Sequence, residues 1–390
     1  MLESAIIYGL LTMVMVVCGI YASRRQFRFE HRFVGGINTH TNLSFAYREI
    51  WLPIILFSII FGCRYDVGID QMTYLDIYLG RIPNNKEFLW RLSVDLFNAC
   101  GVHFAFYFAF WAFVQIFLVY YAIKNYRFLF PYLAFYLMVG HFFLTYMNGI
   151  RASLASCIFF YSIQYVINRK FLKYCLCIII ASLIHKTAIV LLFFYPLLVR
   201  KDDWFCIKSQ IIILITAIVL WINRDWCLSI LTRVFVFFIE LFNYQGGYQY
   251  AFNNPRFGIA IFEQGAHLGR NLGIGQFIDL FLGIVIMAFQ NRLKKKYDTP
   301  LFRISYTFWF LSFVGGIIAG KSYVLERPLL YLMNFKLLIL AYLTHYCFSS
   351  KNITKRLVGA VFVFIYIVLF INIISMGEAN KSMFTFFWQH

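Results

Sequence analysis

Charged and polar side chains recur beside the ends of long apolar segments, where they could act on a substrate at a membrane surface. The first group contains Arg64, Asp66, Asp70 and Tyr74. The planar guanidinium of Arg64 can bind two phosphate oxygens at once. Asp66 and Asp70 lie four residues apart, on one face of the segment if it is helical, and either could accept a proton from a hydroxyl group. The alternative is a local Arg–Asp ion pair that only fixes a loop.

Two further groups lie where apolar segments begin or break. Arg151 follows Asn148 and Gly149, and the small residues behind it allow close packing against a neighbouring helix. Arg151 could therefore point into a cavity, or its charge could extend to the membrane surface. His185 stands beside Lys186 at a break between two segments. The lysine disfavours imidazolium and leaves His185 available as a neutral base, although a lone histidine is more often structural.

The second half of the chain holds two more candidate groups. Glu326 and Arg327 precede a proline that suits the first turn of a helix, and they could form an ion pair or act as an acid and an anion-binding group. The segment 243–275 is rich in glycine, asparagine and aromatic residues and includes Arg256 and Arg270. Aromatic rings stack on the C–H faces of sugars, but an aromatic belt at the membrane interface has the same composition.

The elements that would position these groups are transmembrane helices. Of the 390 residues, 62% are hydrophobic and only 13% are charged, far from the balance of a soluble domain. Several apolar segments reach the roughly 20 residues that cross a hydrocarbon core of about 30 Å. They are continuous rather than alternating, which excludes a transmembrane β-barrel. The sequence therefore predicts an all-α, polytopic integral membrane protein.

Charged links separate twelve predicted spans. They run over about 4–22, 45–62, 102–122, 128–147, 150–167, 171–184, 187–199, 209–222, 276–290, 302–320, 328–347 and 357–375. Lys and Arg gather in alternate links, which the positive-inside rule assigns to the cytoplasm. The alternation holds if 229–241 is an interfacial or re-entrant helix rather than a span. We therefore expect one transmembrane domain over 1–390, with both termini outside. External loops 63–101 and 223–275 are expected, the long one carrying short interfacial helices, with the candidate groups on the external side.

The formal charge of +18 would suggest nucleic acid as a partner in a soluble protein. Here most Lys and Arg lie in short links between apolar segments, so the charge first indicates topology, and no nucleic-acid partner is expected. The cysteines form no CxxC or CxxH pair with metal spacing, and the glycines of 243–275 match no nucleotide-binding pattern. We expect neither a metal nor a cofactor.

Taken together, these residues resemble the EpsG-like branch of the Wzy-type bacterial polysaccharide polymerases. The resemblance covers roughly residues 45–200. The residues that carry it are Arg64, Gly68, Asp70, Tyr74, Asn148, Arg151, Ala155, Ala181, His185 and Ala188. The second half is similar in its long external loop and its Glu-Arg pair near a late helix. The chain departs from the family at Arg151-Ala152, where such proteins commonly have Arg-Gln.

The resemblance implies a metal-independent glycosyltransferase of the bacterial inner membrane. It would join undecaprenyl-diphosphate-linked oligosaccharides on the periplasmic or external face, forming O-antigen, capsule or exopolysaccharide, with a chain-length regulator and a flippase as partners. His185, Asp70 or Asp66 would accept a proton. Substrate and diphosphate binding would fall to Arg64, Arg151, Arg327, Asn148, Tyr74, Glu326, Arg270 and Arg256. A flippase or transporter for lipid-linked sugars, an O-antigen ligase and a non-enzymatic channel or scaffold are the alternatives.

Overall fold

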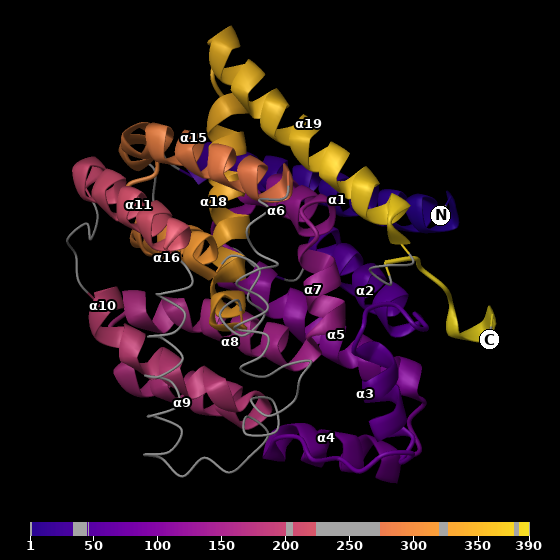
Figure 1. Ribbon diagram of the computed structural model, residues 1–390. Coiled ribbons are helices and arrows are strands. Elements are labelled where there is room, and N and C mark those ends of the chain that lie inside the picture. The colour runs from indigo at the N-terminus through magenta and orange to yellow at the C-terminus, as the bar shows by residue number, and fades with distance from the viewer. Residues whose placement is uncertain are drawn as a thin grey trace. The chain divides into compact units, whose positions relative to one another are not determined.

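The regular elements of the computed structural model are helices (Figure 1). The structure describes residues 2–33, 45, 47–199, 206–223, 274–319, 327–377 and 382–389. Seven helices within these ranges are long and apolar enough to cross a membrane, or eight crossings if one bent pair counts as a single span. The prediction of a polytopic, all-α membrane protein is therefore confirmed. Most of the predicted loop 223–275, including 229–241, lies outside the described residues.

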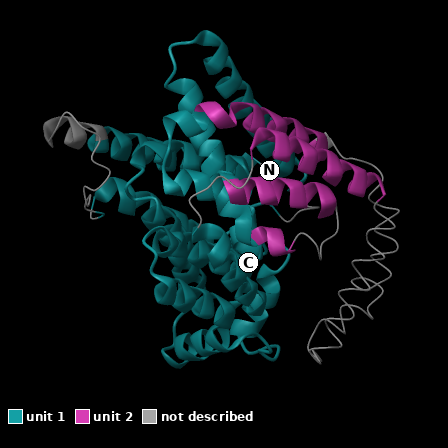
Figure 2. Ribbon diagram, turned by 90° about the vertical axis from the view of Figure 1, so that its left-hand side faces the viewer, with its two compact units in different colours: residues 1–201, 293–306, 331–390 teal, residues 202–292, 307–330 magenta. Residues whose placement is uncertain are grey.

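The chain divides into two compact units, shown in Figure 2. Unit 1 comprises residues 1–201, 293–306 and 331–390, and unit 2 comprises 202–292 and 307–330. The helices that lie wholly in unit 1 are α1 (Leu2–Phe33), α2 (Arg48–Gly62), α3 (Gln71–Tyr78), α4 (Phe88–Ala99), α5 (Phe104–Ala122), η1 (Arg127–Leu129), α6 (Phe130–Val139), α7 (Phe142–Asn148), α8 (Ile150–Ile167), α9 (Phe171–Ile184), η2 (Lys186–Phe194), α10 (Tyr195–Val199), α18 (Met333–Phe348), α19 (Ile353–Ser375) and η4 (Phe387–Gln389).

Unit 2 is held together by close contacts between its helices. It contains α11 (Ile207–Ile222) and most of α15 (Ile274–Lys296), and it shares α16 (Pro300–Ala319) and η3 (Arg327–Leu332) with unit 1. The buried Gln210 side chain donates to Gln290 Oε1 at 2.7 Å, which ties α11 to α15. A Cβ added at Gly283 would come within 2.1 Å of the Phe313 ring, so α15 and α16 pack closely there.

One predicted span is bent into two helices. The sequence predicts a single span over 128–147, but the chain forms one arm up to Val139 and a second arm, α7, with a bend of 62° between them. His141 at the bend has a φ of +65°, a left-handed conformation that no α-helix continues. The helix α7 therefore ends inside the protein, where the buried Met147 carbonyl accepts a hydrogen bond from Arg64 Nη2 at 3.0 Å.

The predicted external loop 63–101 contains two short helices, α3 and α4, and its course is fixed by the C-terminal segment 382–389. Arg64 and Phe386 form an isolated antiparallel bridge, and the Phe387 N–H donates to the Cys63 carbonyl at 3.0 Å. Backbone groups on both segments gain partners by this pairing. The turn that leaves α2 is thereby held in one position before the chain enters α3.

A series of buried hydrogen bonds positions Tyr331 against α8. The Tyr146 hydroxyl donates to Asn334 Oδ1, Asn334 Nδ2 donates to Ser156 Oγ at 3.0 Å, and Ser156 Oγ donates to the Tyr331 carbonyl at 3.1 Å. Polar groups between transmembrane helices need such partners because lipid supplies none. The series ties α7 and α8 to the start of α18, so that the Tyr331 side chain reaches the end of α9.

We expect Gly62→Ala to destabilise the protein by roughly 1–3 kcal/mol. A Cβ at this position would lie 2.4 Å from the Ala105 carbonyl oxygen and 2.5 Å from the Ala109 Cβ, because α2 and α5 pack almost backbone to backbone there. Thermal unfolding of purified protein in detergent measures the effect. Gly9→Ala is the control, since nothing lies within 4 Å of its added Cβ. Equal unfolding temperatures for the two variants would contradict this account of the packing.

Candidate active site

Arg64 is turned into the protein, with 1% of its surface exposed. Its guanidinium donates to the carbonyls of Phe61 and Met147, and it lies 5.5 Å from the centre of the Phe108 ring. Its own carbonyl accepts from the buried Gln71 side chain at 2.8 Å. The planar fork of Arg64 is therefore directed at backbone carbonyls, and it joins the ends of α2 and α7.

Asn148 holds the start of α3 against the end of α7. Its Oδ1 accepts from the Asp70 N–H at 2.8 Å. Gly68, two residues before Asp70, has a φ of +91°. A Cβ at Gly68 would lie 3.4 Å from the Cα and Oδ1 of Asn148. A side chain at this position would be strained by the backbone conformation, which glycine adopts freely. Asp70 and, one helical turn later, Tyr74 are thus presented beside the first turn of α8.

Arg151 stands in that first turn of α8 and is the centre of the polar contacts. Its Nη1 forms an ion pair with Glu87 Oε2, and its Nε donates to the Tyr74 hydroxyl at 3.4 Å. The guanidinium carbon lies 5.8 Å from the centre of the Tyr74 ring. The side chains of Arg151 and Glu87 are 16% and 21% exposed, so the pair is only partly screened by water. A partly buried guanidinium of this kind is suited to binding an anion.

Glu87 connects Arg151 to the end of α9. It is the residue just before α4, and its Oε1 accepts from the Lys186 N–H at 3.2 Å. Burial opposes its ionisation, but the charge of Arg151, two backbone N–H groups and His185 together hold the pKa of Glu87 below its ordinary value. Burial and the charge of Arg151 lower the pKa of Lys86, the preceding residue. Glu87 therefore remains a carboxylate at neutral pH.

His185 lies at the end of α9 and is held by two hydroxyl groups. Its Nδ1 is 2.9 Å from Thr187 Oγ1 and 2.9 Å from the Tyr331 hydroxyl oxygen, and these two oxygens are 2.7 Å apart. His185 is half-buried, and Lys186 beside it is exposed. Hydroxyl groups accept as well as donate, so they can orient the imidazole in either tautomer.

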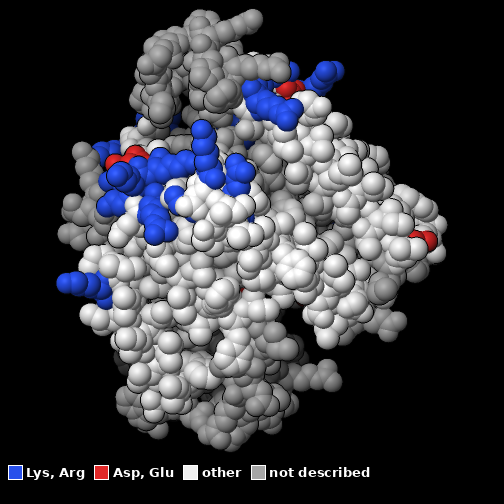
Figure 3. Space-filling model, turned by 90° about the horizontal axis from the view of Figure 1, so that it is seen from above, with Lys and Arg blue, Asp and Glu red and all other residues white. Residues whose placement is uncertain are grey.

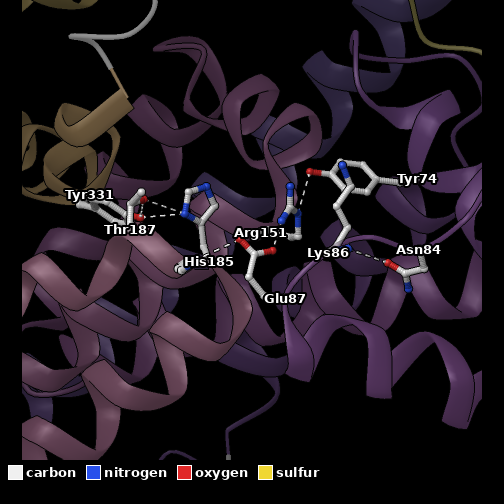
Figure 4. A network of polar contacts seen from close by, with 9 residues as sticks. Tyr74, Asn84, Lys86, Glu87, Arg151, His185, Thr187 and Tyr331 are labelled. Carbon is white, nitrogen blue, oxygen red and sulfur yellow. Dashed lines mark hydrogen bonds and ion pairs between the residues drawn. The ribbon is translucent and has the colours of Figure 1, made fainter. Parts of the chain in front are cut away.

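These contacts form one region of unit 1, which we name the Arg151 cluster: Tyr74, Glu87, Arg151, His185, Thr187 and Tyr331. Figure 4 shows them as a row, from Tyr331 and Thr187 past His185 to Glu87, Arg151 and Tyr74. The cluster offers a cation for an anionic group and, beside it, an imidazole and a carboxylate that can exchange protons. Within the described ranges, no group of three or more His, Cys, Asp or Glu side chains could hold a metal ion.

The structure brings five of the residues singled out from the sequence to this region: Asp70, Tyr74, Asn148, Arg151 and His185. Arg151 contacts Tyr74 directly, and Asp70 is fixed by Asn148. Burial raises the pKa of Tyr74, and although Arg151 opposes the rise, the nearby Asp70 adds to it. The charge of Asp70 therefore acts within the same region as that of Arg151.

The remaining predicted residues are not in the cluster. Arg64 is bound to backbone carbonyls behind it. Asp66 is exposed in the turn before α3, at a φ of +51°. Arg327 is exposed and belongs to unit 2. The residues that lie outside the described part of the chain are Glu326, Arg256 and Arg270.

The structure adds Glu87, Thr187 and Tyr331 to the residues singled out from the sequence. Glu87 has one sequence signal, because an acidic residue directly before an apolar segment is typical of a helix start. Thr187 follows His185 by two residues and carries an ordinary hydroxyl. Nothing in the sequence pairs Tyr331 with His185, which lies 146 positions away.

Glu87→Gln should lower the stability of the folded protein by roughly 2 kcal/mol at pH 7, since the charge-assisted bonds to Arg151 and the Lys186 N–H weaken. Because the pKa of Glu87 is lowered on folding, this stability is present above the ordinary carboxyl pKa of 4.5 and is lost as the pH falls below it. Thermal unfolding of wild type and variant at neutral and acid pH checks the effect.

Asp95→Asn is the matched control for Glu87→Gln. Asp95 lies on the same helix, α4, and is exposed. Its loss should leave the unfolding temperature unchanged at both pH values. A destabilisation by Glu87→Gln that persists undiminished at acid pH would show that the carboxylate charge is not its cause.

Comparison with known proteins supplies the family. The model of the EpsG family matches residues 50–388, which covers most of the chain and includes every residue of the Arg151 cluster. No curated protein matches the chain, and no solved structure matches it. The resemblance drawn from Arg64, Asp70, Arg151 and His185 is thus confirmed. The chain is a polytopic membrane protein that belongs to the EpsG family.

Proposed function

We propose that this protein is a polysaccharide polymerase that joins undecaprenyl-diphosphate-linked oligosaccharide repeat units in a bacterial inner membrane. Membership of the EpsG family supports a membrane polymerase. The observation that carries the proposal is the pairing of Arg151 with Glu87 next to His185. A cation for a diphosphate and a base for a hydroxyl are the two groups that transfer of a sugar from a lipid diphosphate requires.

In the proposed reaction, the growing chain on one lipid diphosphate is the donor and a new lipid-linked unit is the acceptor. A hydroxyl oxygen of the acceptor's terminal sugar attacks the anomeric carbon of the donor. The bond between that carbon and the diphosphate oxygen breaks, and the lipid diphosphate leaves with the bonding electrons. The hydroxyl proton passes to a base. The only products are the lengthened chain on the acceptor's lipid and the released lipid diphosphate.

Arg151 would stabilise the negative charge that develops on the leaving diphosphate. Its ion pair with Glu87 and its bond to Tyr74 hold the guanidinium in one orientation before substrate arrives. Electrostatic groups that are already oriented stabilise a transition state most effectively, because they need not reorganise during the reaction. Glu87 and Tyr74 are in this view positioning residues.

His185 is the base that the geometry favours. The hydroxyls of Thr187 and Tyr331 orient its ring, and it stands beside Glu87, whose carboxylate would stabilise an imidazolium. Asp70 is the second candidate because it lies in the same region as Arg151. It ranks after His185 because the contact that fixes it, with Asn148, is made by its backbone N–H and not by its carboxylate. We retain Asp66 as the third.

The other residues take supporting roles in the proposal. Asn148 positions Asp70, and Arg64 positions the ends of α2 and α7, which support the first turn of α8. Arg327 is assigned to diphosphate binding on the resemblance alone. Substrate contacts outside the described residues are assigned, on the resemblance alone, to Glu326, Arg256 and Arg270.

We also propose twelve crossings, with the Arg151 cluster on the periplasmic or external face. Among its residues are Arg151 at the start of α8, His185 at the end of α9 and Tyr331 in η3, just before α18. The basic links lie at the opposite ends of these helices, as the positive-inside rule requires of cytoplasmic links. A chain-length regulator and a flippase that delivers lipid-linked units are the expected partners.

A reconstitution experiment separates this function from a flippase and from an O-antigen ligase. Purified protein in liposomes receives two lipid-linked repeat units, without ATP and without a lipid A core. A polymerase lengthens the glycan and releases one lipid diphosphate for each unit joined. Transport of the units without extension would indicate a flippase, and extension only after a lipid A core is added would indicate a ligase. Either result would overturn the proposal.

A further inference from the structure

Two lysines converge on one tyrosine at the end of α18, away from the Arg151 cluster. Lys355 Nζ donates to the Tyr346 hydroxyl at 2.9 Å and lies 4.9 Å from the centre of its ring. Lys296 Nζ lies 5.3 Å from the same ring centre and donates to Ser349 Oγ. All four residues belong to unit 1. Helix α18 has 16 residues, so its two ends lie about 24 Å apart, close to the thickness of a hydrocarbon core.

This arrangement holds two like charges together without a carboxylate between them. Neither Lys296 nor Lys355 forms an ion pair within the described part of the chain. The only acidic residue in the two links concerned, 291–301 and 348–356, is Asp298, which pairs with Arg303 at 3.6 Å. Figure 3 shows basic side chains gathered on the face seen from above, with few acidic ones beside them. Two adjacent ammonium groups repel each other, and an anion between them removes that cost.

The groups around the two lysines suit a phosphate. The hydroxyl oxygens of Ser349 and Tyr346 accept hydrogen bonds from the two ammonium groups and hold them in place, and the Tyr346 ring gives an apolar wall. Arg356 adds positive charge from the same link. Polybasic groups next to a transmembrane helix attract anionic lipids, and each Lys near the surface contributes about a fivefold gain in affinity.

We propose that Lys296, Lys355, Tyr346 and Ser349 form a binding site for the phosphate headgroup of an anionic phospholipid. The site lies where α15 and α18 end and α19 begins, at the depth where headgroups meet the ends of transmembrane helices. The lipid phosphate bridges the two ammonium groups and accepts hydrogen bonds from them. The lipid thereby links α15 to α18 and α19 and stabilises the basic ends of these helices.

Native mass spectrometry of the full-length protein tests the site. Wild-type protein should retain phosphatidylglycerol in preference to phosphatidylcholine, whose phosphate is neutralised by its own choline. Lys296→Gln and Lys355→Gln should each weaken retention of phosphatidylglycerol about fivefold. Lys355→Arg keeps the charge and should retain the lipid as wild type does. Thermal unfolding in the presence of each lipid gives a second readout, with a stabilisation by phosphatidylglycerol that both Gln variants lose.

Lys351→Gln is the matched control, because it removes one positive charge from the same link, four residues before Lys355, without touching the two converging lysines. It should leave retention unchanged within about twofold, well below the fivefold loss expected at the site. Equal losses in Lys351→Gln and Lys355→Gln would mean diffuse attraction and overturn the proposal, as would unchanged retention in both site variants. Displacement of the lipid by an excess of inorganic phosphate would show that a free anion is the occupant.

Discussion

Arg151→Ala should lower the rate of polymer formation about a hundredfold, which corresponds to a loss of roughly 3 kcal/mol of transition-state stabilisation. Arg151 is the one partly buried cation that contacts both Glu87 and Tyr74 in the described structure. Without it, the charge that develops on the leaving diphosphate has no oriented counter-charge. The measurement is the initial rate of glycan extension by reconstituted protein, with polymer length in a polymerase-deficient strain as the cellular readout.

Arg91→Ala is the matched control for Arg151→Ala. Arg91 lies on α4, one turn after Glu87, and is exposed. It should support extension at the wild-type rate. Arg151→Lys retains the charge but not the planar fork, so its rate should fall between those of Ala and wild type. If Arg151→Ala extends chains normally at normal expression, Arg151 is not part of the catalytic machinery.

His185→Ala should lower the turnover rate a hundredfold or more, since removal of a general base typically costs about 10²–10⁴-fold. The effect should be confined to turnover, because Arg151 still binds the diphosphate. We therefore expect a large fall in kcat with little change in KM for the lipid-linked donor, whereas Arg151→Ala should change both. Initial rates across a range of donor concentrations separate the two variants.

Two variants control for a merely structural effect of His185→Ala. Tyr331→Phe keeps the ring and removes one of the hydroxyls that hold the imidazole, so it should lower kcat by much less than His185→Ala. His103→Asn changes another histidine, at the start of α5, and preserves a side chain that can cap the helix. It should be fully active. If His185→Ala raises KM and leaves kcat unchanged, the base is another residue, and Asp70 becomes the first candidate.

The membrane architecture could be predicted from the sequence because a helix that crosses lipid needs an uninterrupted run of apolar residues. Uninterrupted apolar runs such as 150–167 and 171–184 correspond to α8 and α9 without a shift. The sequence does not reveal the bend of 62° within the predicted span 128–147. Hydropathy measures how well each side chain suits lipid and carries no information on the backbone angle φ. The left-handed conformation of His141 therefore cannot be read from the hydropathy of the segment.

The candidate site could be predicted in part. The sequence singles out Arg151 because it stands where an apolar segment begins, and His185 because it stands at a break between two apolar segments. The sequence likewise predicts that Arg64 binds phosphate oxygens, yet its guanidinium donates to backbone carbonyls. A guanidinium binds carbonyl and phosphate oxygens alike, so the residue type cannot distinguish the two partners. Tyr331 could not be found, because its contact with His185 depends on how α18 packs against α8.

A structure of the protein with an undecaprenyl-diphosphate-linked repeat unit bound tests the central claim most directly. We predict that the diphosphate oxygens lie within hydrogen-bonding distance of the Arg151 guanidinium, with the anomeric carbon on the side that faces His185. Glu87 should then share Arg151 with the diphosphate or release it. A diphosphate bound elsewhere, with the Arg151–Glu87 ion pair intact and no substrate atom near His185, would contradict the assignment of this cluster as the active site.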